Sequence, residues 1–203
     1  MKRSITAVRL AAATLLLLPS LASAQNLYTW TGTEQTMSTR LYRDGSNSTA
    51  GSLKAFPGTV GLGTYSFTFF TFQNTSGSTQ TFNAQILGQT GENLPHFSLY
   101  LGTFNPANVS ENYLGDGGVS CFGTPCVGNT SLGVDIGAGS TVVLVAATAD
   151  RAAVAGDTFT WTGPDARYFE SSVVPEPTTN LLVASGLVSL ALVARRRRKL
   201  QHG

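Results

Sequence analysis

The chain has 203 residues, of which 42% are hydrophobic and only 12% charged, and its formal net charge is +2. These totals exclude an intrinsically disordered chain, a disulfide-dense miniprotein and a polytopic membrane protein. The 22 glycines, among many Ser and Thr residues, are typical of closely spaced strands and turns.

The first 24 residues have the three parts of a secretory signal peptide: a basic start, an apolar stretch over residues 10–18, and small side chains at Ala22 and Ala24. The pattern predicts export by the Sec translocon and cleavage by signal peptidase after Ala24, which leaves Gln25 as the first residue. The alternative is an uncleaved membrane anchor. The apolar stretch is shorter than the roughly 20 residues that a spanning helix needs, which favours the signal peptide.

The exported part, residues 25–174, is acidic although the whole chain is basic. It contains five Lys and Arg residues and ten Asp and Glu residues, a net charge of −5. Binding to nucleic-acid phosphates needs a clustered basic surface. We therefore expect no nucleic-acid partner.

Alternating apolar and polar residues predict an all-β domain between residues 25 and 174. Eight short strands separated by turns predict a β-sandwich of jelly-roll type. The expected strands are Leu27–Thr31, Tyr65–Gln73, Gln80–Leu87, Phe97–Leu101, Ser131–Ile136, Thr141–Thr148, Thr158–Gly163 and Tyr168–Val173.

Three details of these strands are also expected. Aromatic residues change parity at Phe69 and Phe70, which predicts a β-bulge there. The stretch Val142–Ala147 is apolar on both parities and predicts a central strand covered on both faces, although a short buried helix has the same pattern. The stretches 74–78 and 137–139 predict hairpin turns, because Asn and Gly tolerate positive φ.

Cys121 and Cys126 flank four residues of a loop that contains Gly and Pro. In an oxidising periplasm we expect them to form a small disulfide, since no other soft ligands for a metal lie nearby in the sequence. A ring this short constrains little of the unfolded chain. It should pin the loop rather than hold the domain together.

No catalytic residue is predicted. His96 is the only histidine between residues 25 and 174, and no Gly-x-Ser-x-Gly nucleophile elbow accompanies it. A lone histidine at the start of a strand indicates a surface or capping residue rather than a general base.

No metal and no cofactor is predicted either. The acidic, Gly-rich stretch 114–118 could supply oxygen ligands for Ca²⁺, but it lacks Asp-x-Asp spacing, which favours a turn. The Gly-rich stretch 57–63 precedes a strand instead of a helix, so it lacks the helix N-terminus that would hold a phosphate. It is expected to be a loop.

Aromatic side chains on one exposed face could stack on sugar rings, although Trp and Tyr in sandwiches usually belong to the core. The candidates are Trp30, Tyr100, Tyr113, Trp161 and Tyr168. Four Asn-x-Ser/Thr triplets are expected to mark polar turns rather than glycans; they begin at Asn47, Asn74, Asn108 and Asn129.

The carboxyl terminus has three consecutive parts. A Pro-Glu-Pro motif at Pro175, Glu176 and Pro177 keeps the chain extended and stops a helix from continuing through it. An apolar stretch follows, and a helix over about residues 178–194 can span a membrane that thins slightly. The basic tail, residues 195–203, should remain cytoplasmic because of five consecutive cations, Arg195, Arg196, Arg197, Arg198 and Lys199.

This order of parts resembles the sorting signal of the PEP-CTERM proteins of Gram-negative bacteria, and the resemblance covers about the last thirty residues. An aromatic residue commonly follows the motif in that class, whereas Thr179 and Asn180 stand there in this chain. The resemblance implies processing by an exosortase, a membrane transpeptidase, and transfer to an acceptor in the envelope or exopolysaccharide. A plain one-helix anchor with a Pro-rich linker is the alternative.

The sequence therefore predicts a signal peptide (residues 1–24), an exported β-sandwich (25–174) and a PEP-CTERM sorting signal (175–203). The precursor is expected in the inner membrane, facing the periplasm, and the product in the cell envelope or extracellular matrix. We expect a non-enzymatic protein that serves as adhesive or carbohydrate-contacting material and has exopolysaccharide as a partner. The alternative is a membrane-tethered periplasmic hydrolase with an unrecognised active site.

Overall fold

The computed structural model describes residues 25–127 and 130–171, and all regular structure in these two ranges is β. The strands are β1 (Gln25–Thr29), β2 (Gln35–Met37), β3 (Arg40–Leu41), β4 (Thr59–Val60), β5 (Tyr65–Asn74), β6 (Gln80–Thr90), β7 (Pro95–Leu101), β8 (Tyr113–Asp116), β9 (Ser131–Ile136), β10 (Thr141–Thr148), β11 (Thr158–Thr162) and β12 (Phe169–Ser171).

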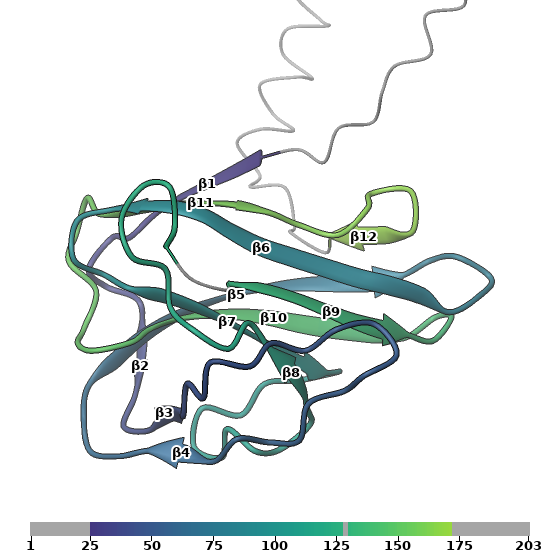
Figure 1. Cartoon of the computed structure of the whole chain (residues 1–203), viewed down its shortest axis with the longest axis horizontal. Helices are drawn as coiled ribbons and strands as arrows, with labels where there is room; N and C mark the ends of the chain where they lie inside the picture. The colour runs from purple at the N-terminus through teal and green to yellow at the C-terminus, as the bar shows by residue number, and fades with distance from the viewer. Residues whose placement is uncertain (1–24, 128–129, 172–203) are drawn as a thin grey trace, which may run out of the picture.

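Most strands belong to two antiparallel sheets that lie one above the other (Figure 1). The four-stranded sheet has the order β1-β11-β6-β9. The six-stranded sheet has the order β12-β5-β10-β7-β8, and β2 also pairs with β5. This arrangement is consistent with the predicted β-sandwich.

The main core fills the space between the two sheets. Alternate residues of β6, such as Phe82 and Ile86, meet alternate residues of β10, such as Val142 and Leu144, and all four are fully buried. Trp161 of β11 packs on Phe97 of β7, with ring centroids 5.5 Å apart in an edge-to-face arrangement. The period-two pattern of the sequence thus supplies one buried face of each sheet.

A second core lies on the opposite face of the six-stranded sheet. It contains Val143 and Val145 of β10, Phe67 of β5 and Tyr100 of β7. The segment 37–60, which contains β3 and β4, lies against this face (Figure 1). The prediction of a central strand covered on both faces is therefore confirmed for β10, which lies between β5 and β7.

The second core also explains the aromatic residues of β5. The predicted bulge at Phe69 and Phe70 is wrong, because β5 pairs with β10 in continuous register through both residues. Phe70 and Phe72 face the main core, whereas Tyr65 and Phe67 face the second core. Aromatic residues on both parities of a straight strand reflect two buried faces, not a change of face.

The turns at 74–78 and 137–139 are present, but the predicted hairpins are wrong. The first joins β5 to β6 and the second joins β9 to β10, so each passes from one sheet to the other. Buried Asn74 ties the two crossings together. Its side-chain Nδ2 donates to the backbone carbonyl oxygens of Ile136 (2.8 Å) and Gly137 (3.1 Å), and its backbone carbonyl accepts from the Gly139 amide (2.8 Å).

The eight predicted strands are all present, and those at 131–136 and 141–148 have the predicted bounds. The short strands β2, β3, β4 and β8 were not predicted. The predicted signal peptide and transmembrane helix lie outside the described residues, and no helix able to span a membrane occurs in the described part.

Candidate functional site

The residues predicted to carry sorting lie outside the structurally described ranges. These are the motif Pro175, Glu176 and Pro177, the tail from Arg195 to Lys199, and Ala22 and Ala24 before the cleavage position. Gln25, the predicted first residue of the exported form, is the first residue of β1 and pairs with Thr162. The residue predicted to become the amino terminus thus belongs to the four-stranded sheet.

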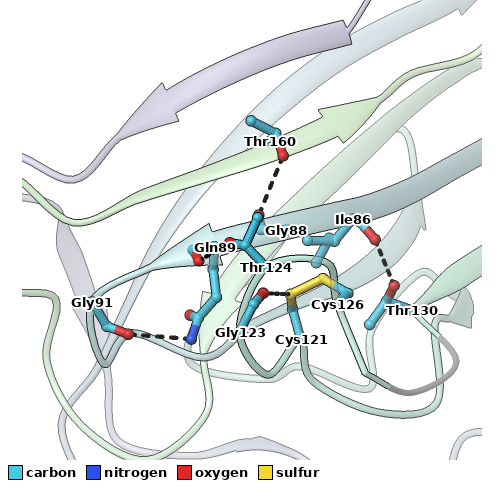
Figure 2. Close-up of a disulfide and its surroundings, with 10 residues drawn as sticks. All are labelled: Ile86, Gly88, Gln89, Gly91, Cys121, Gly123, Thr124, Cys126, Thr130 and Thr160. Atoms are coloured by element: carbon cyan, nitrogen blue, oxygen red, sulfur yellow. Dashed lines mark hydrogen bonds between the residues drawn. A yellow bond between two sulfur atoms is a disulfide. The ribbon is translucent and has the colours of Figure 1, made fainter.

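The predicted disulfide between Cys121 and Cys126 is present (Figure 2). The two Cα atoms are 4.9 Å apart, and Cys121 is fully buried. In the loop-entropy description a ring this short stabilises the folded state by at most about 2 kcal/mol. Its role is local and follows from what the loop contacts.

The disulfide loop covers the end of β6 that β9 does not reach. The pairing of β6 with β9 ends at Gln85. Beyond it, the Cys126 amide donates to the Leu87 carbonyl (2.8 Å), and the Gln89 amide donates to the Gly123 carbonyl (3.1 Å). The Thr124 hydroxyl also donates to the Gln89 carbonyl (Figure 2). The loop thus satisfies backbone groups at a sheet edge that would otherwise be open.

A concentrated group of polar side chains surrounds Asp116, at the end of β8. The Asp116 side chain is completely buried, and its Oδ1 accepts from Lys54 Nζ at 2.9 Å and from the Gly118 amide at 2.6 Å. The Tyr113 hydroxyl donates to Oδ2. Lys54 also donates to Asp44 Oδ1 (2.6 Å) and to the Ser46 carbonyl (2.7 Å). We call Lys54 and Asp116 the latch, since they join segment 37–60 to β8.

The contacts of Asp116 keep its carboxylate ionised. Burial alone would raise its pKa, but the neighbouring His96, Tyr113 and Lys54 outweigh burial and lower the pKa to about 2. Of the three, Lys54 brings a full positive charge within hydrogen-bond distance, with Nζ 2.9 Å from Asp116 Oδ1. Burial and the Asp116 charge together raise the pKa of Tyr113, so its hydroxyl remains a donor.

His96 lies beside the latch, and its predicted surface or capping position is wrong. The residue is buried on the face of β7 that meets the second core. Its Nε2 lies 3.5 Å from Asp116 Oδ1 without forming a hydrogen bond. Burial lowers the pKa of His96, and Asp116 opposes this only in part, so the imidazole is neutral at pH 7.

The space beside His96 does not admit a substrate. The cavity that His96, Ser98 and Tyr100 line has a volume of about 10 Å³, which is close to the room needed by one water molecule. Arg43 completes the wall, donating to Ser120 Oγ (2.7 Å) and pairing with Asp150 (3.2 Å). The arrangement fixes segment 37–60 on the sheet.

The stretches considered for ion binding have other roles. Residues 113–116 form strand β8 rather than the expected turn, and Asp116 binds Lys54. Among the described residues no group of three or more His, Cys, Asp or Glu side chains is placed to hold a metal. The stretch 57–63 is largely a loop, as predicted, with the two-residue strand β4 inside it.

The aromatic residues considered for sugar stacking do not form an exposed face. Trp30, Tyr100 and Trp161 are at most 4% exposed, and Tyr113 and Tyr168 are partly buried against the two cores. The stacking hypothesis is therefore wrong for these residues. Of the Asn-x-Ser/Thr sites, Asn74 is buried, Asn47 is partly buried, Asn108 is exposed in a turn and Asn129 lies outside the described ranges.

The residues that sequence reasoning missed are Lys54, Asp44 and Arg43. They come from a stretch without alternating hydrophobicity, which gave no element to place them on. The one available signal was scarcity, since Lys54 is the single lysine between residues 25 and 174. In a domain with twice as many carboxylates as cations, a single lysine is expected to pair with a carboxylate.

The comparisons with known proteins locate a function at the carboxyl terminus. The family model for the PEP-CTERM protein-sorting motif matches residues 173–198. The predicted motif, helix and arginine tail all lie within or at the end of this range. No curated protein and no solved structure matches the chain. The motif supports an exported protein that an exosortase sorts, made as a precursor that passes the membrane.

The pKa of His96 gives a prediction for stability against pH. A histidine that is neutral in the fold takes up a proton more readily when unfolded, so stability is lost as the pH falls below about 6.5. We expect the melting temperature of the His96→Gln variant to fall less between pH 7.5 and 5 than that of the wild type. The difference corresponds to no more than about 2 kcal/mol at pH 5.

The measurement is thermal unfolding at both pH values, followed by circular dichroism. Carboxylates that His96 does not contact contribute equally to both proteins in this comparison, because only residue 96 differs, and Asp116 keeps Lys54 and Tyr113 as partners in the variant. Asp116, with a pKa of about 2, stays ionised in the fold throughout the range. Parallel pH profiles would show that His96 does not titrate differently in the folded and unfolded states.

Proposed function

We propose that the chain is a non-enzymatic protein of the cell envelope or exopolysaccharide, delivered by its PEP-CTERM signal, whose exported domain serves as adhesive or carbohydrate-contacting material. The single observation that carries the proposal is the sorting motif at residues 173–198. Residues 1–24 then direct export through Sec. The predicted helix at about 178–194 would hold the precursor in the inner membrane until exosortase acts at Pro175, Glu176 and Pro177.

The position of the folded part supports this order of events. The described strands begin at Gln25, directly after the proposed signal-peptide cleavage position. The last of them, β12, ends at Ser171, two positions before the matched region. Cleavage after Ala24 and near the motif would therefore leave β1 to β12, the strands of the described ranges, in one piece.

The strand order supports the finer assignment of the fold to the jelly-roll type. From β5 to β7 and again from β8 to β11, the chain passes back and forth between the two sheets. Strand β1 pairs with the late strand β11, and β5 pairs with β10. Early strands that lie beside late strands are what two interlocked Greek keys produce.

The surroundings of His96 support a non-enzymatic role. A hydrolase that used a histidine base would need it within reach of a nucleophile and a substrate. His96 instead faces a cavity of about 10 Å³ beneath segment 37–60. The alternative, a membrane-tethered periplasmic hydrolase, would have to use groups other than this histidine.

Mass spectrometry of the envelope-associated protein tests the sorting step. We expect no peptide from Leu181 onward in the mature form, because cleavage near the motif separates the helix and the arginine tail. The triple variant Pro175→Ala, Glu176→Ala, Pro177→Ala should retain those peptides. An intact tail on the wild-type protein would favour the plain membrane anchor instead.

Co-sedimentation with the exopolysaccharide of the expressing cells tests the role of the exported domain. The purified full chain, in detergent, is mixed with the polysaccharide, and bound protein and newly formed reducing ends are both measured. We expect retention of the protein without new reducing ends. Release of sugar would support the hydrolase, and absence of retention would exclude polysaccharide contact.

A further inference from the structure

A polar groove crosses the outer face of the four-stranded sheet. One wall is the loop 47–50, the floor is formed by β6 and β9, and Thr162 and Gly163 also line the groove, with Thr162 paired to Gln85 of β6. The groove has a volume of about 310 Å³. Ligand pockets for small molecules begin at about 300 Å³, so the space accommodates a compact ligand or part of a polymer.

The loop that forms the wall is firmly held. The Ser48 carbonyl accepts from the Gly133 amide (2.9 Å), and the Ser48 amide donates to the Asp116 carbonyl (2.9 Å). Asn47 Nδ2 reaches Ser131 Oγ at 3.5 Å. A side chain at Gly133 would put Cβ 3.0 Å from Asn83 Oδ1 and 3.3 Å from the Ala50 amide, so glycine keeps the floor open. The groove exists before any ligand binds, which lowers the entropic cost of binding.

The groove is lined by hydrogen-bonding groups without charge. The amides of Asn47, Asn83 and Gln85 and the hydroxyls of Ser131 and Thr162 line it, and no charged residue is among its described lining residues. Asn83 and Gln85 are exposed, and neither side chain bonds to another residue in the described ranges. Each amide can both donate and accept. An ionic ligand would find no opposite charge here, whereas a neutral ligand rich in hydroxyl groups would find partners along the groove.

A second groove is less suited to such a ligand. It has a volume of about 420 Å³ and lies between β1 and β5, beside the half-exposed ring of Phe69. Its carboxylate, Glu34, already accepts from the Thr31 amide (2.5 Å) and hydroxyl (2.8 Å) and from the Gly32 amide (3.0 Å). These polar atoms close a turn of the protein and are not available for a ligand.

We propose that the groove between loop 47–50 and the outer face of β6 and β9 binds a segment of a neutral polysaccharide, with Asn83, Gln85 and Thr162 as hydrogen-bonding contacts. The proposal rests on the proposed carbohydrate-contacting function and assigns it a site and a ligand class. No aromatic residue lines the groove, so recognition depends on hydrogen bonds. Each single hydrogen bond is weak, and many molecules of the protein bound along one polysaccharide chain would together hold it firmly.

The test measures binding of the purified full chain, in detergent, to the neutral fraction of the expressing cells' exopolysaccharide by isothermal titration, with anionic alginate as the charge control. We expect the wild type to bind the neutral fraction and not alginate. The double variant Asn83→Ala, Gln85→Ala should bind about tenfold or more weakly, because it loses up to four hydrogen bonds. Its melting temperature should not change, since both side chains are exposed.

The control is the double variant Gln35→Ala, Gln73→Ala, which removes two exposed amides from the six-stranded sheet: Gln35 lines the second groove, and Gln73 donates to the Gly139 carbonyl (3.2 Å). It should bind like the wild type. Thr162→Val, which keeps the side-chain shape, provides a second groove variant if the first does not fold, and it should bind more weakly.

The outcomes separate the site from the function. Wild-type binding that neither groove variant weakens would overturn the groove and leave the proposed function standing. Loss of binding in the Gln35 and Gln73 control alone would also overturn it, in favour of the second groove. A wild type that binds no neutral polysaccharide would overturn both, and preference for alginate would overturn the ligand class.

Discussion

The outer face of β10 must be shielded from water, and most of the structure follows from this requirement. Val143, Val145 and their neighbours on β5 and β7 form an apolar surface on the side of the six-stranded sheet that faces away from its partner sheet. A sheet with one face open to solvent would be polar there. Segment 37–60 provides the cover, and the latch between Lys54 and Asp116 fastens it, with Arg43 as a second attachment. Asp116 is completely buried, so its charge is shielded from water and acts strongly on Lys54. Removal of that charge would leave Lys54 with only the partly exposed Asp44 as a carboxylate partner.

The same construction connects the fold with the proposed polysaccharide-binding groove. Loop 47–50, which walls the polar groove, lies within the latched cover and bonds to both Asp116 and Gly133. The disulfide loop closes another exposed edge at the end of β6 (Figure 2). The carboxylate of Asp116, which is completely buried, is paired with Lys54. The described part of the chain thus presents neutral amides and hydroxyls on one face, which is the face where we propose that a neutral polysaccharide binds.

Period-two alternation was sufficient to predict the strands that line the main core, because a face that packs on the other sheet selects every second residue. It cannot show that β5 has a second buried face, so the change of parity at Phe69 and Phe70 predicts a bulge that the structure does not contain. Turn residues at 74–78 and 137–139 predict where the chain bends but not which sheet it enters next, since Asn and Gly occur in both kinds of turn.

The positions of His96 and Asp116 could not be predicted for a related reason: their surroundings come from residues 43–54, which carry no periodic pattern. The polar groove likewise depends on Asn47 lying beside Ser131, a proximity created by the fold.

Native-state hydrogen exchange on the Asp116→Asn variant tests most directly whether the latch holds the cover. Breaking a buried ion pair destabilises by about 3–5 kcal/mol. The amide of Tyr42, bonded to Gly58 within the cover, and the amide of Ser48, bonded to the Asp116 carbonyl, should therefore exchange at least about 100-fold faster. The amides that pair β6 with β11 should remain protected to the same extent as in the wild type, because the main core is unchanged. Equal protection of Tyr42 and Ser48 in both proteins would contradict the account.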